Sequence, residues 1–68
     1  MKQVSGKALI KIAADHGWVV DRIKGSHHIL LKEGESSILT IPVHSNQPLK
    51  IGLLKALMKQ AGLTEGDL

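Results

Sequence analysis

The order of apolar and polar positions divides this 68-residue chain into five elements. Between residues 5 and 16 apolar side chains recur at helical spacing, with the charged side chains between them. Ser5 is a favourable N-cap, and Val4 before it can pack against Leu9, four positions into the helix. Gly17 follows as a typical residue for the end of a helix. The pattern predicts a helix over residues 5–16.

Three runs rich in β-branched residues follow, separated by short polar turns, and each predicts a strand. The predicted strands cover residues 18–24, 27–32 and 37–41, the last of them ending near Pro42. Gly25 and Ser26 form a tight reversal between the first two strands. The second strand is apolar at three consecutive positions, 29–31, so alternation does not define its core face. Whether His27 or His28 points outward is therefore left open.

A polar, proline-containing loop over residues 43–48 leads into a second predicted helix, from Leu49 or Lys50 to Ala61. Gly62 is its stop signal, and Thr64 can cap one further turn in the acidic tail. The apolar stripe of this helix comprises Ile51, Leu54, Leu57, Met58 and Ala61.

The predicted order is α-β-β-β-α in a single domain spanning residues 1–68. Short connections favour a three-stranded antiparallel sheet with both helices on one face, which is a two-layer α+β sandwich. Double-stranded-RNA-binding domains share this arrangement, but a fold alone does not assign a function.

The size and cysteine content limit how this fold can be stabilised. A core of this size contributes about 3–5 kcal/mol net, and the chain has no cysteine for a disulfide or a thiolate metal site. We therefore expect a homodimer or a tight complex with a partner. The N-terminal apolar stretch is too short and too charged for a signal peptide or a membrane span, so we expect a soluble protein. The lack of cysteine is consistent with the reducing cytoplasm.

The charge balance favours a polyanionic partner. Nine Lys and Arg oppose six Asp and Glu, and residues 1–63 hold all nine bases but only four acids, a formal charge of +5. A modest positive charge can also serve solubility alone. Trp18 is the sole aromatic residue, so the chain cannot offer several rings for stacking bases. If the partner is RNA, we expect recognition through backbone charge and shape.

His27 and His28 are the first candidates for chemistry. An imidazole titrates at about 6.5 and can take a proton from a ribose 2′-hydroxyl, whose oxygen then attacks the adjacent phosphate without a metal. Arg22, Lys24 or Lys50 could offset the charge that develops on the phosphate, and Arg22 could do so bidentately. For an arbitrary pair of histidines, however, a surface position with no task is the commoner outcome.

Other polar residues support weaker hypotheses. His44 is a second acid–base group, an RNA contact or a solvent-facing loop residue. Ser26 serves the turn or binds phosphate, since no nucleophile motif surrounds it. Lys50 begins a helix whose Gly52 would let an anion approach free N–H groups, although Gly52 can equally serve helix packing. The four histidines lack carboxylate ligands nearby, so we predict no metal site and no cofactor.

Taken together, the ordered motifs resemble the HicA (YcfA-like) toxin family over residues 5–64. The motifs are Gly17-Trp18, Arg22-x-Lys24-Gly25-Ser26-His27-His28, Ile41-Pro42-Val43-His44, Leu49-Lys50-Ile51-Gly52-Leu53-Leu54-Lys55 and Lys59-Gln60-Ala61-Gly62-Leu63. Two positions depart from the family pattern. Leu53 stands where the family often has threonine, and Leu30 lies near a position that is commonly aromatic.

The resemblance implies more than the residue patterns do. HicA proteins are toxins of type II toxin–antitoxin pairs, with a fold like that of double-stranded-RNA-binding domains. They cleave mRNA independently of the ribosome and are neutralised by a HicB antitoxin that covers the active site. The resemblance assigns the catalytic role to His27, which follows Gly-Ser, and gives His28 a less essential place. The residues expected to bind the substrate are Arg22, Lys24, Gly25, Ser26, His28, His44 and Lys50. The alternatives are a non-catalytic module of the same fold that binds RNA or an antitoxin, and a structural partner whose basic surface only docks an acidic chain.

Overall fold

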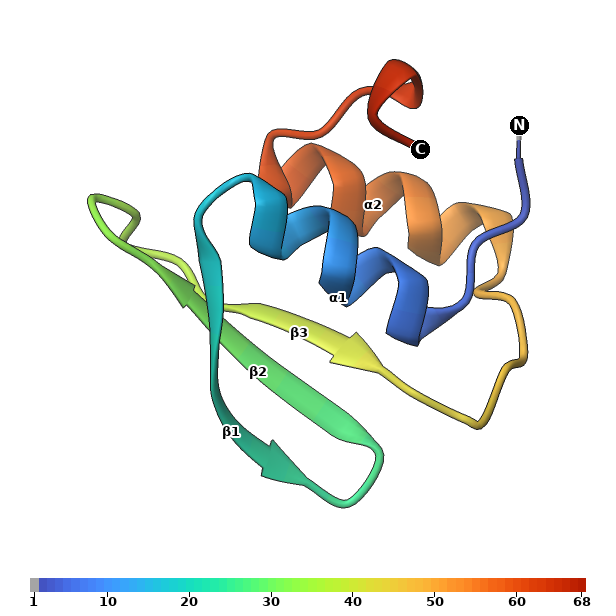
Figure 1. The fold of residues 1–68 in the computed structure, drawn as a ribbon, viewed down its shortest axis with the longest axis horizontal. Coiled ribbons are helices and arrows are strands. Elements are labelled where there is room, and N and C mark those ends of the chain that lie inside the picture. Colours follow the sequence, from blue (N-terminus) through green and yellow to red (C-terminus); the bar gives the residue numbers. More distant parts are fainter. Residues whose placement is uncertain (1) are drawn as a thin grey trace.

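The computed structural model of the chain describes residues 2–68 and has the predicted element order (Figure 1). The elements are α1 (Gly6–Asp15), β1 (Trp18–Lys24), β2 (His27–Lys32), β3 (Leu39–Pro42), α2 (Ile51–Ala61) and a short 3₁₀ turn, η1 (Glu65–Asp67). Neither helix within residues 2–68 combines the length and the apolar character that crossing a membrane requires.

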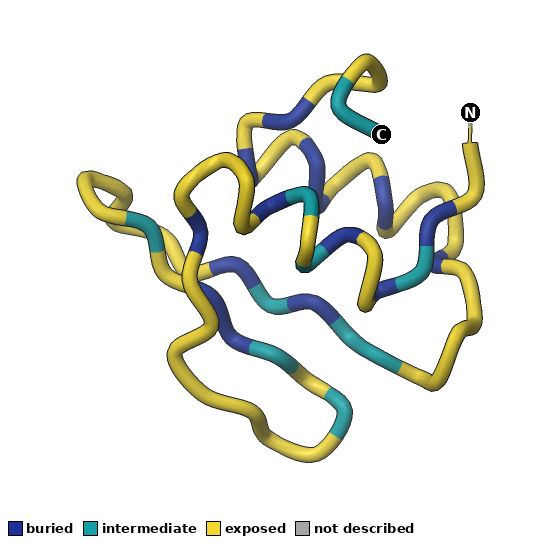
Figure 2. The backbone as a smooth tube through the Cα atoms, viewed as in Figure 1, coloured by how far each residue is buried: buried dark blue, intermediate teal, exposed yellow. Residues whose placement is uncertain are grey.

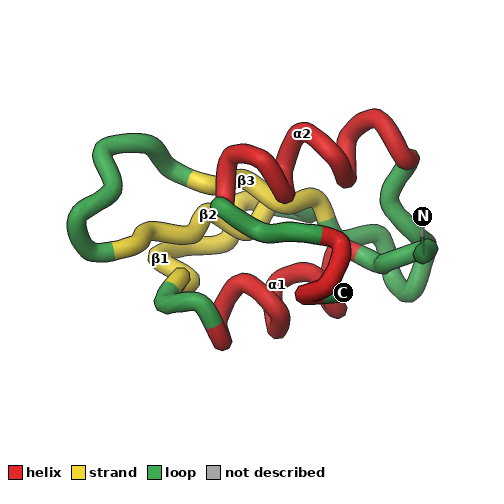
Figure 3. The backbone as a smooth tube through the Cα atoms, turned by 90° about the horizontal axis from the view of Figure 1, so that it is seen from above, coloured by secondary structure: helices red, strands yellow, loops and turns green. Residues whose placement is uncertain are grey.

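The three strands form one antiparallel sheet in the order β1-β2-β3. Both helices lie side by side on the same side of this sheet (Figures 1 and 3). The fold is therefore the expected two-layer α+β sandwich. We call the sheet surface turned away from the helices the open face.

The N-terminal end of α1 is fixed against the end of β3. The Ser5 hydroxyl accepts a hydrogen bond from the Ala8 N–H at 3.1 Å, which confirms the predicted cap. Gly6 is buried where the helix meets the sheet, and a Cβ built there would run into the Pro42 carbonyl oxygen. Only glycine therefore lets α1 approach β3 this closely.

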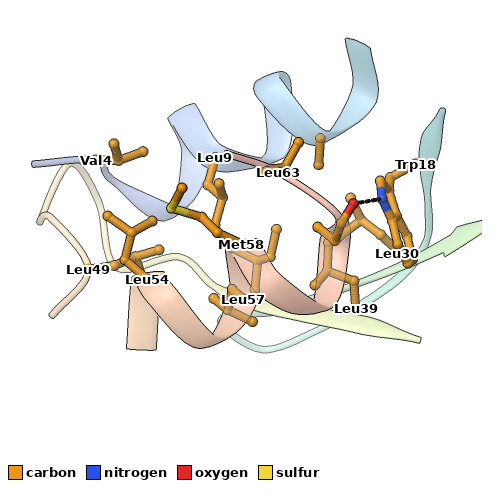
Figure 4. Close-up of a cluster of buried hydrophobic side chains, with 13 residues drawn as sticks. Val4, Leu9, Trp18, Leu30, Leu39, Leu49, Leu54, Leu57, Met58 and Leu63 are labelled. Carbon is orange, nitrogen blue, oxygen red and sulfur yellow. Dashed lines mark hydrogen bonds between the residues drawn. The ribbon is translucent and has the colours of Figure 1, made fainter. Parts of the chain in front are cut away.

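The core lies between the helices and the sheet and is entirely apolar (Figures 2 and 4). Its most deeply buried large side chains are Leu9, Trp18, Leu30, Leu39, Ile41 and Leu54. The Trp18 indole N–H donates to the Ala61 carbonyl oxygen at 3.2 Å, a bond that ties the start of β1 to the end of α2 (Figure 4). Because the indole is buried and bonded there, it is not available to stack on a nucleotide base.

Two details of the elements differ from the sequence expectation. The residues before Leu39 bend instead of pairing, because Leu31 and Lys32 of β2 pair with β1 alone, so β3 begins at Leu39 and not at residue 37. Ile51, expected in the apolar stripe of α2, is 40% exposed, since it begins the helix beyond the edge of the core.

The acidic tail forms the further turn that Thr64 was expected to cap. The Asp67 carboxylate accepts hydrogen bonds from the Thr64 backbone N–H at 2.7 Å and from its hydroxyl at 3.1 Å. His16 at the end of α1 lies 3.4 Å from the other carboxylate oxygen. The tail is thereby held against the helical layer, away from the open face.

Candidate functional site

The hairpin between β1 and β2 is a two-residue reversal. Lys24 and His27 are cross-strand partners, and Gly25 and Ser26 connect them. Gly25 has a φ of 58°, the left-handed conformation that a type II′ hairpin requires at its first turn position. Nothing lies within 4 Å of a Cβ built at Gly25, so its role in the turn is conformational and not one of packing.

The pleat of β2 determines which of His27 and His28 points away from the core, which the sequence left open. Leu30 is fully buried in the core between helices and sheet, so His28, two residues away, faces the helical side. His27 alternates with it and lies exposed on the open face. The adjacent histidines therefore occupy opposite surfaces of the sheet.

His28 sits in an apolar setting. Its cross-strand partners are Ile23 on β1 and Ile41 on β3, and its Nδ1 atom is buried without a hydrogen-bond partner. The side chain is half-buried. Such a position suits a packing role better than contact with a polyanion.

His27 is surrounded on the open face by polar and basic residues. Its direct cross-strand partners are Lys24 on β1 and Pro42 on β3. Arg22 and Thr40 pair with Ile29, the next residue of β2 on this face, so both lie diagonally from His27. We call His27, Lys24, Arg22 and Thr40 the open-face cluster.

A β-bulge makes this cluster possible. The register between β1 and β2 shifts between Val20 and Arg22, which leaves Asp21 as the extra residue. In a regular strand Trp18, Arg22 and Lys24 would share one face, because their numbers differ by even steps. The bulge lets Trp18 face the core while both cations stand beside His27. The sequence signal for this feature is slight, a single acid within an apolar and basic run.

The remaining predicted residues divide into two groups. The Val43 N–H donates to the Ser26 carbonyl oxygen at 2.7 Å, so strand-like contact continues past His27 and brings exposed His44 alongside the hairpin turn. Lys50 instead forms the N-cap of α2 in the helical layer, apart from the open face. The structure thus gathers His27, Arg22, Lys24, Gly25, Ser26 and His44 at one end of the sheet but separates His28 and Lys50 from them.

Sequence reasoning missed Thr40. It was part of a predicted strand, and only the pairing of β2 with β3 shows that its half-buried side chain shares a face with His27. A hydroxyl at this place can donate to or accept from a bound phosphate or ribose. Among residues 2–68, no three His, Asp or Glu side chains come together in a way that could hold a metal ion.

These features define a small, basic α+β domain whose candidate functional residues stand on the open face of a three-stranded sheet. Residues 6–63 match the model of the family described as the HicA toxin of bacterial toxin-antitoxin, and the chain belongs to this family. Every residue of the open-face cluster lies inside the matched range. A search of curated proteins gave no match.

Proposed function

We propose that this toxin is an mRNA endoribonuclease that acts in the cytoplasm without a metal ion. The observation that carries the proposal is the position of His27, exposed on the open face with Lys24 directly across and Arg22 diagonally across from it. An imidazole next to two fixed cations has what the cleavage of a phosphodiester needs, a proton acceptor and positive charge for the phosphate.

The proposed reaction uses the RNA's own 2′-hydroxyl as the nucleophile. His27 takes the proton of this hydroxyl, the freed oxygen forms a bond to the adjacent phosphorus, and the bond from phosphorus to the 5′-oxygen breaks. The departing 5′-oxygen takes a proton from solvent or from His44, which lies beside the hairpin turn. The products are a 2′,3′-cyclic phosphate and a 5′-hydroxyl, so the atoms balance without a further reactant.

The other residues of this end of the sheet have supporting parts in the proposal. Arg22 and Lys24 bind the phosphate, and Gly25 and Ser26 hold the turn that positions His27. Substrate contacts by His28 and Lys50, suggested by the sequence, have less support because neither residue lies on the open face. The partner in the cell is a HicB-like antitoxin protein, and any larger oligomer forms through that complex.

Induction of the toxin in cells tests this function. We expect wild type to arrest growth and to fragment mRNA, and His27→Ala to do neither. His16→Ala is a matched control, because it removes the same ring from the helical layer. Equal toxicity of wild type and His27→Ala would contradict the role of His27. Growth arrest without loss of mRNA would favour the second candidate, a module that binds RNA or the antitoxin without cutting.

A further inference from the structure

His44 is held in place by backbone hydrogen bonds on both sides. Before it, the Val43 N–H donates to the Ser26 carbonyl oxygen at 2.7 Å, so the chain keeps its contact with the hairpin turn after β3 ends. After it, the Gln47 N–H donates to the His44 carbonyl oxygen at 3.0 Å and closes a tight turn. The backbone of His44 is therefore fixed relative to His27, although the residue lies in a loop.

The turn after His44 contains an uncommon backbone conformation. Ser45 has a φ of 54°, and within residues 2–68 it is the only residue other than glycine with a positive φ. A residue with a Cβ is strained in this left-handed region, and such strain is found mostly at functional sites. The strain at Ser45 therefore indicates that the position of His44 serves a function.

The sheet register places His44 diagonally from His27 on the open face. His27 pairs with Pro42, and His44 follows two residues later on the same side of the pleat. The hairpin turn and the start of the loop after β3 lie at the same end of the sheet (Figure 1). A diagonal pair of this kind is separated by about 7–8 Å between Cα atoms. Thr40 is the diagonal neighbour on the other side of Pro42, so His44 lies beyond the open-face cluster, toward the hairpin turn.

This separation suits two groups that act on opposite sides of one phosphate. In the proposed cleavage the attacking 2′-oxygen and the departing 5′-oxygen lie roughly in line on either side of phosphorus, so the proton acceptor and the proton donor must stand apart. Two hydrogen bonds of about 2.8 Å each, with the phosphate between them, span a distance of the same order as the diagonal separation. His27 and His44 can therefore contact the two reacting oxygens of one phosphodiester at the same time.

The other side chains of the chain are less suited to donate the second proton. Of the four histidines, His28 faces the helical side of the sheet and His16 contacts Asp67 in the helical layer. Lysine and arginine side chains hold their protons too firmly at neutral pH to be efficient acids. His44 is the remaining imidazole beside His27, and it is exposed.

We propose that His44 is the general acid of the cleavage reaction. As the 2′-oxygen, deprotonated by His27, bonds to phosphorus, the electron pair of the bond from phosphorus to the 5′-oxygen moves onto that oxygen, which takes a proton from the His44 imidazolium. The products are the 2′,3′-cyclic phosphate and the 5′-hydroxyl, and proton exchange with water returns both rings to their starting forms. This inference rests on the proposed function and assigns to His44 the proton that solvent could otherwise supply.

The test uses an RNA oligonucleotide in which sulfur replaces the 5′-oxygen at a bond that wild type cleaves. A thiol titrates at about 8.5, so a thiolate departs without a proton donor, and a variant that lacks only the general acid still cleaves this RNA. We expect His44→Ala to cleave ordinary RNA at least about a hundredfold more slowly than wild type, but the sulfur-containing RNA within about tenfold of it. His27→Ala should be slow on both RNAs, because the proton acceptor is missing in each case. His16→Ala is the matched control and should cleave both RNAs as wild type does.

Three outcomes would overturn the assignment of His44. One is cleavage of ordinary RNA by His44→Ala at the wild-type rate, which leaves solvent as the proton source. Another is an equal defect of His44→Ala on both RNAs, which makes His44 a binding residue. The third is rescue by sulfur of His27→Ala but not of His44→Ala, which reverses the two roles. If circular dichroism shows that His44→Ala does not fold, His44→Gln is measured against the same criteria. Failure of wild type to cleave ordinary RNA would contradict the proposed function and with it this inference, and it differs from the three outcomes above, in which wild type is active.

Discussion

At the scale of single residues, two neighbouring histidines have different surroundings because a strand alternates its side chains. His27 stands exposed beside Lys24, whereas His28 lies between Ile23 and Ile41 with a buried, unpartnered Nδ1 atom. A cation next to an imidazole suits chemistry on a polyanion, and aliphatic neighbours do not. The same residue type therefore supports a catalytic proposal at one position and a packing role at the next.

Gly6 provides a stability prediction at this scale. In Gly6→Ala the new methyl group would run into the Pro42 carbonyl oxygen, so the backbone of α1 or β3 must shift. We expect the free energy of unfolding to fall by about 1–3 kcal/mol, as for other overpacked sites, when measured by urea denaturation. Because Pro42 is the cross-strand partner of His27, RNA cleavage should fall as well.

The matched control for Gly6→Ala is Gly52→Ala in α2. Nothing lies within 4 Å of a Cβ built at Gly52, and alanine favours helix more than glycine does. The free energy of unfolding should therefore rise by up to about 1 kcal/mol. Equal effects of the two substitutions would show that the close approach at Gly6 is not restrictive.

At the scale of elements, local sequence signals account for most of the fold. The cap at Ser5 and the stop at Gly62 are signals within a few residues of a helix end, and α1 begins directly after Ser5 and α2 ends directly before Gly62. The Gly25-Ser26 reversal is equally local and is confirmed as a two-residue hairpin. Elements whose ends depend on short-range chemistry were therefore predictable.

The features that the sequence did not reveal depend on pairing between strands. The bulge at Asp21 depends on constraints at the two ends of β1. Trp18 faces the core at one end, and the hairpin register pairs Lys24 with His27 at the other. The start of β3 is set by how far β2 pairs beyond Leu30, and the neighbours of Thr40 follow from the same register. The register of one strand against another is set by residues that are far apart in the sequence, so a short stretch of sequence cannot predict it.

The C-terminal turn has a predicted pH dependence. The hydrogen bond from the Thr64 backbone N–H holds the pKa of the Asp67 carboxyl below its ordinary value of 3.8. Burial opposes this shift, and the Thr64 hydroxyl and His16 lower the pKa by smaller amounts. A carboxyl whose folded pKa is depressed stabilises the turn above its unfolded pKa, and this contribution is lost as the pH falls through the folded pKa.

The Thr64 amide proton reports this titration directly by NMR. As the pH falls, its chemical shift should change with a midpoint below 3.8. Asp67→Ala should remove the pH-dependent change, because the acceptor is gone. A midpoint at or above 3.8 in wild type would contradict the assigned hydrogen bond.

At the scale of the whole molecule, the apolar core and the residues proposed to bind RNA lie on opposite sides of the sheet. The helices and the inner sheet surface hold the apolar core, while the open face carries the open-face cluster at one end and the exposed pair Val19 and Leu31 at the other.

The basic end makes a prediction about salt. For binding of a single-stranded RNA, each neutralised phosphate contributes about −0.7 to the slope of log K against log salt concentration. With RNA carrying no reactive 2′-hydroxyl, Arg22→Gln and Lys24→Gln should each make the slope shallower by about that amount. The control is Lys55→Gln, on α2 in the helical layer, which should leave the slope at the wild-type value. Equal slopes in all three variants would contradict the assigned phosphate contacts.

The central claim is that His27 cleaves RNA through the 2′-hydroxyl without a metal, and it is tested most directly with the purified toxin, free of any partner. Synthetic RNA is incubated with wild type, His27→Ala or His16→Ala in excess EDTA, and the ends of the fragments are identified by mass spectrometry. Wild type and His16→Ala should yield 2′,3′-cyclic phosphate and 5′-hydroxyl ends, and His27→Ala should be slower by at least about a hundredfold. Cleavage by His27→Ala at the wild-type rate, or activity that EDTA abolishes, would contradict the claim.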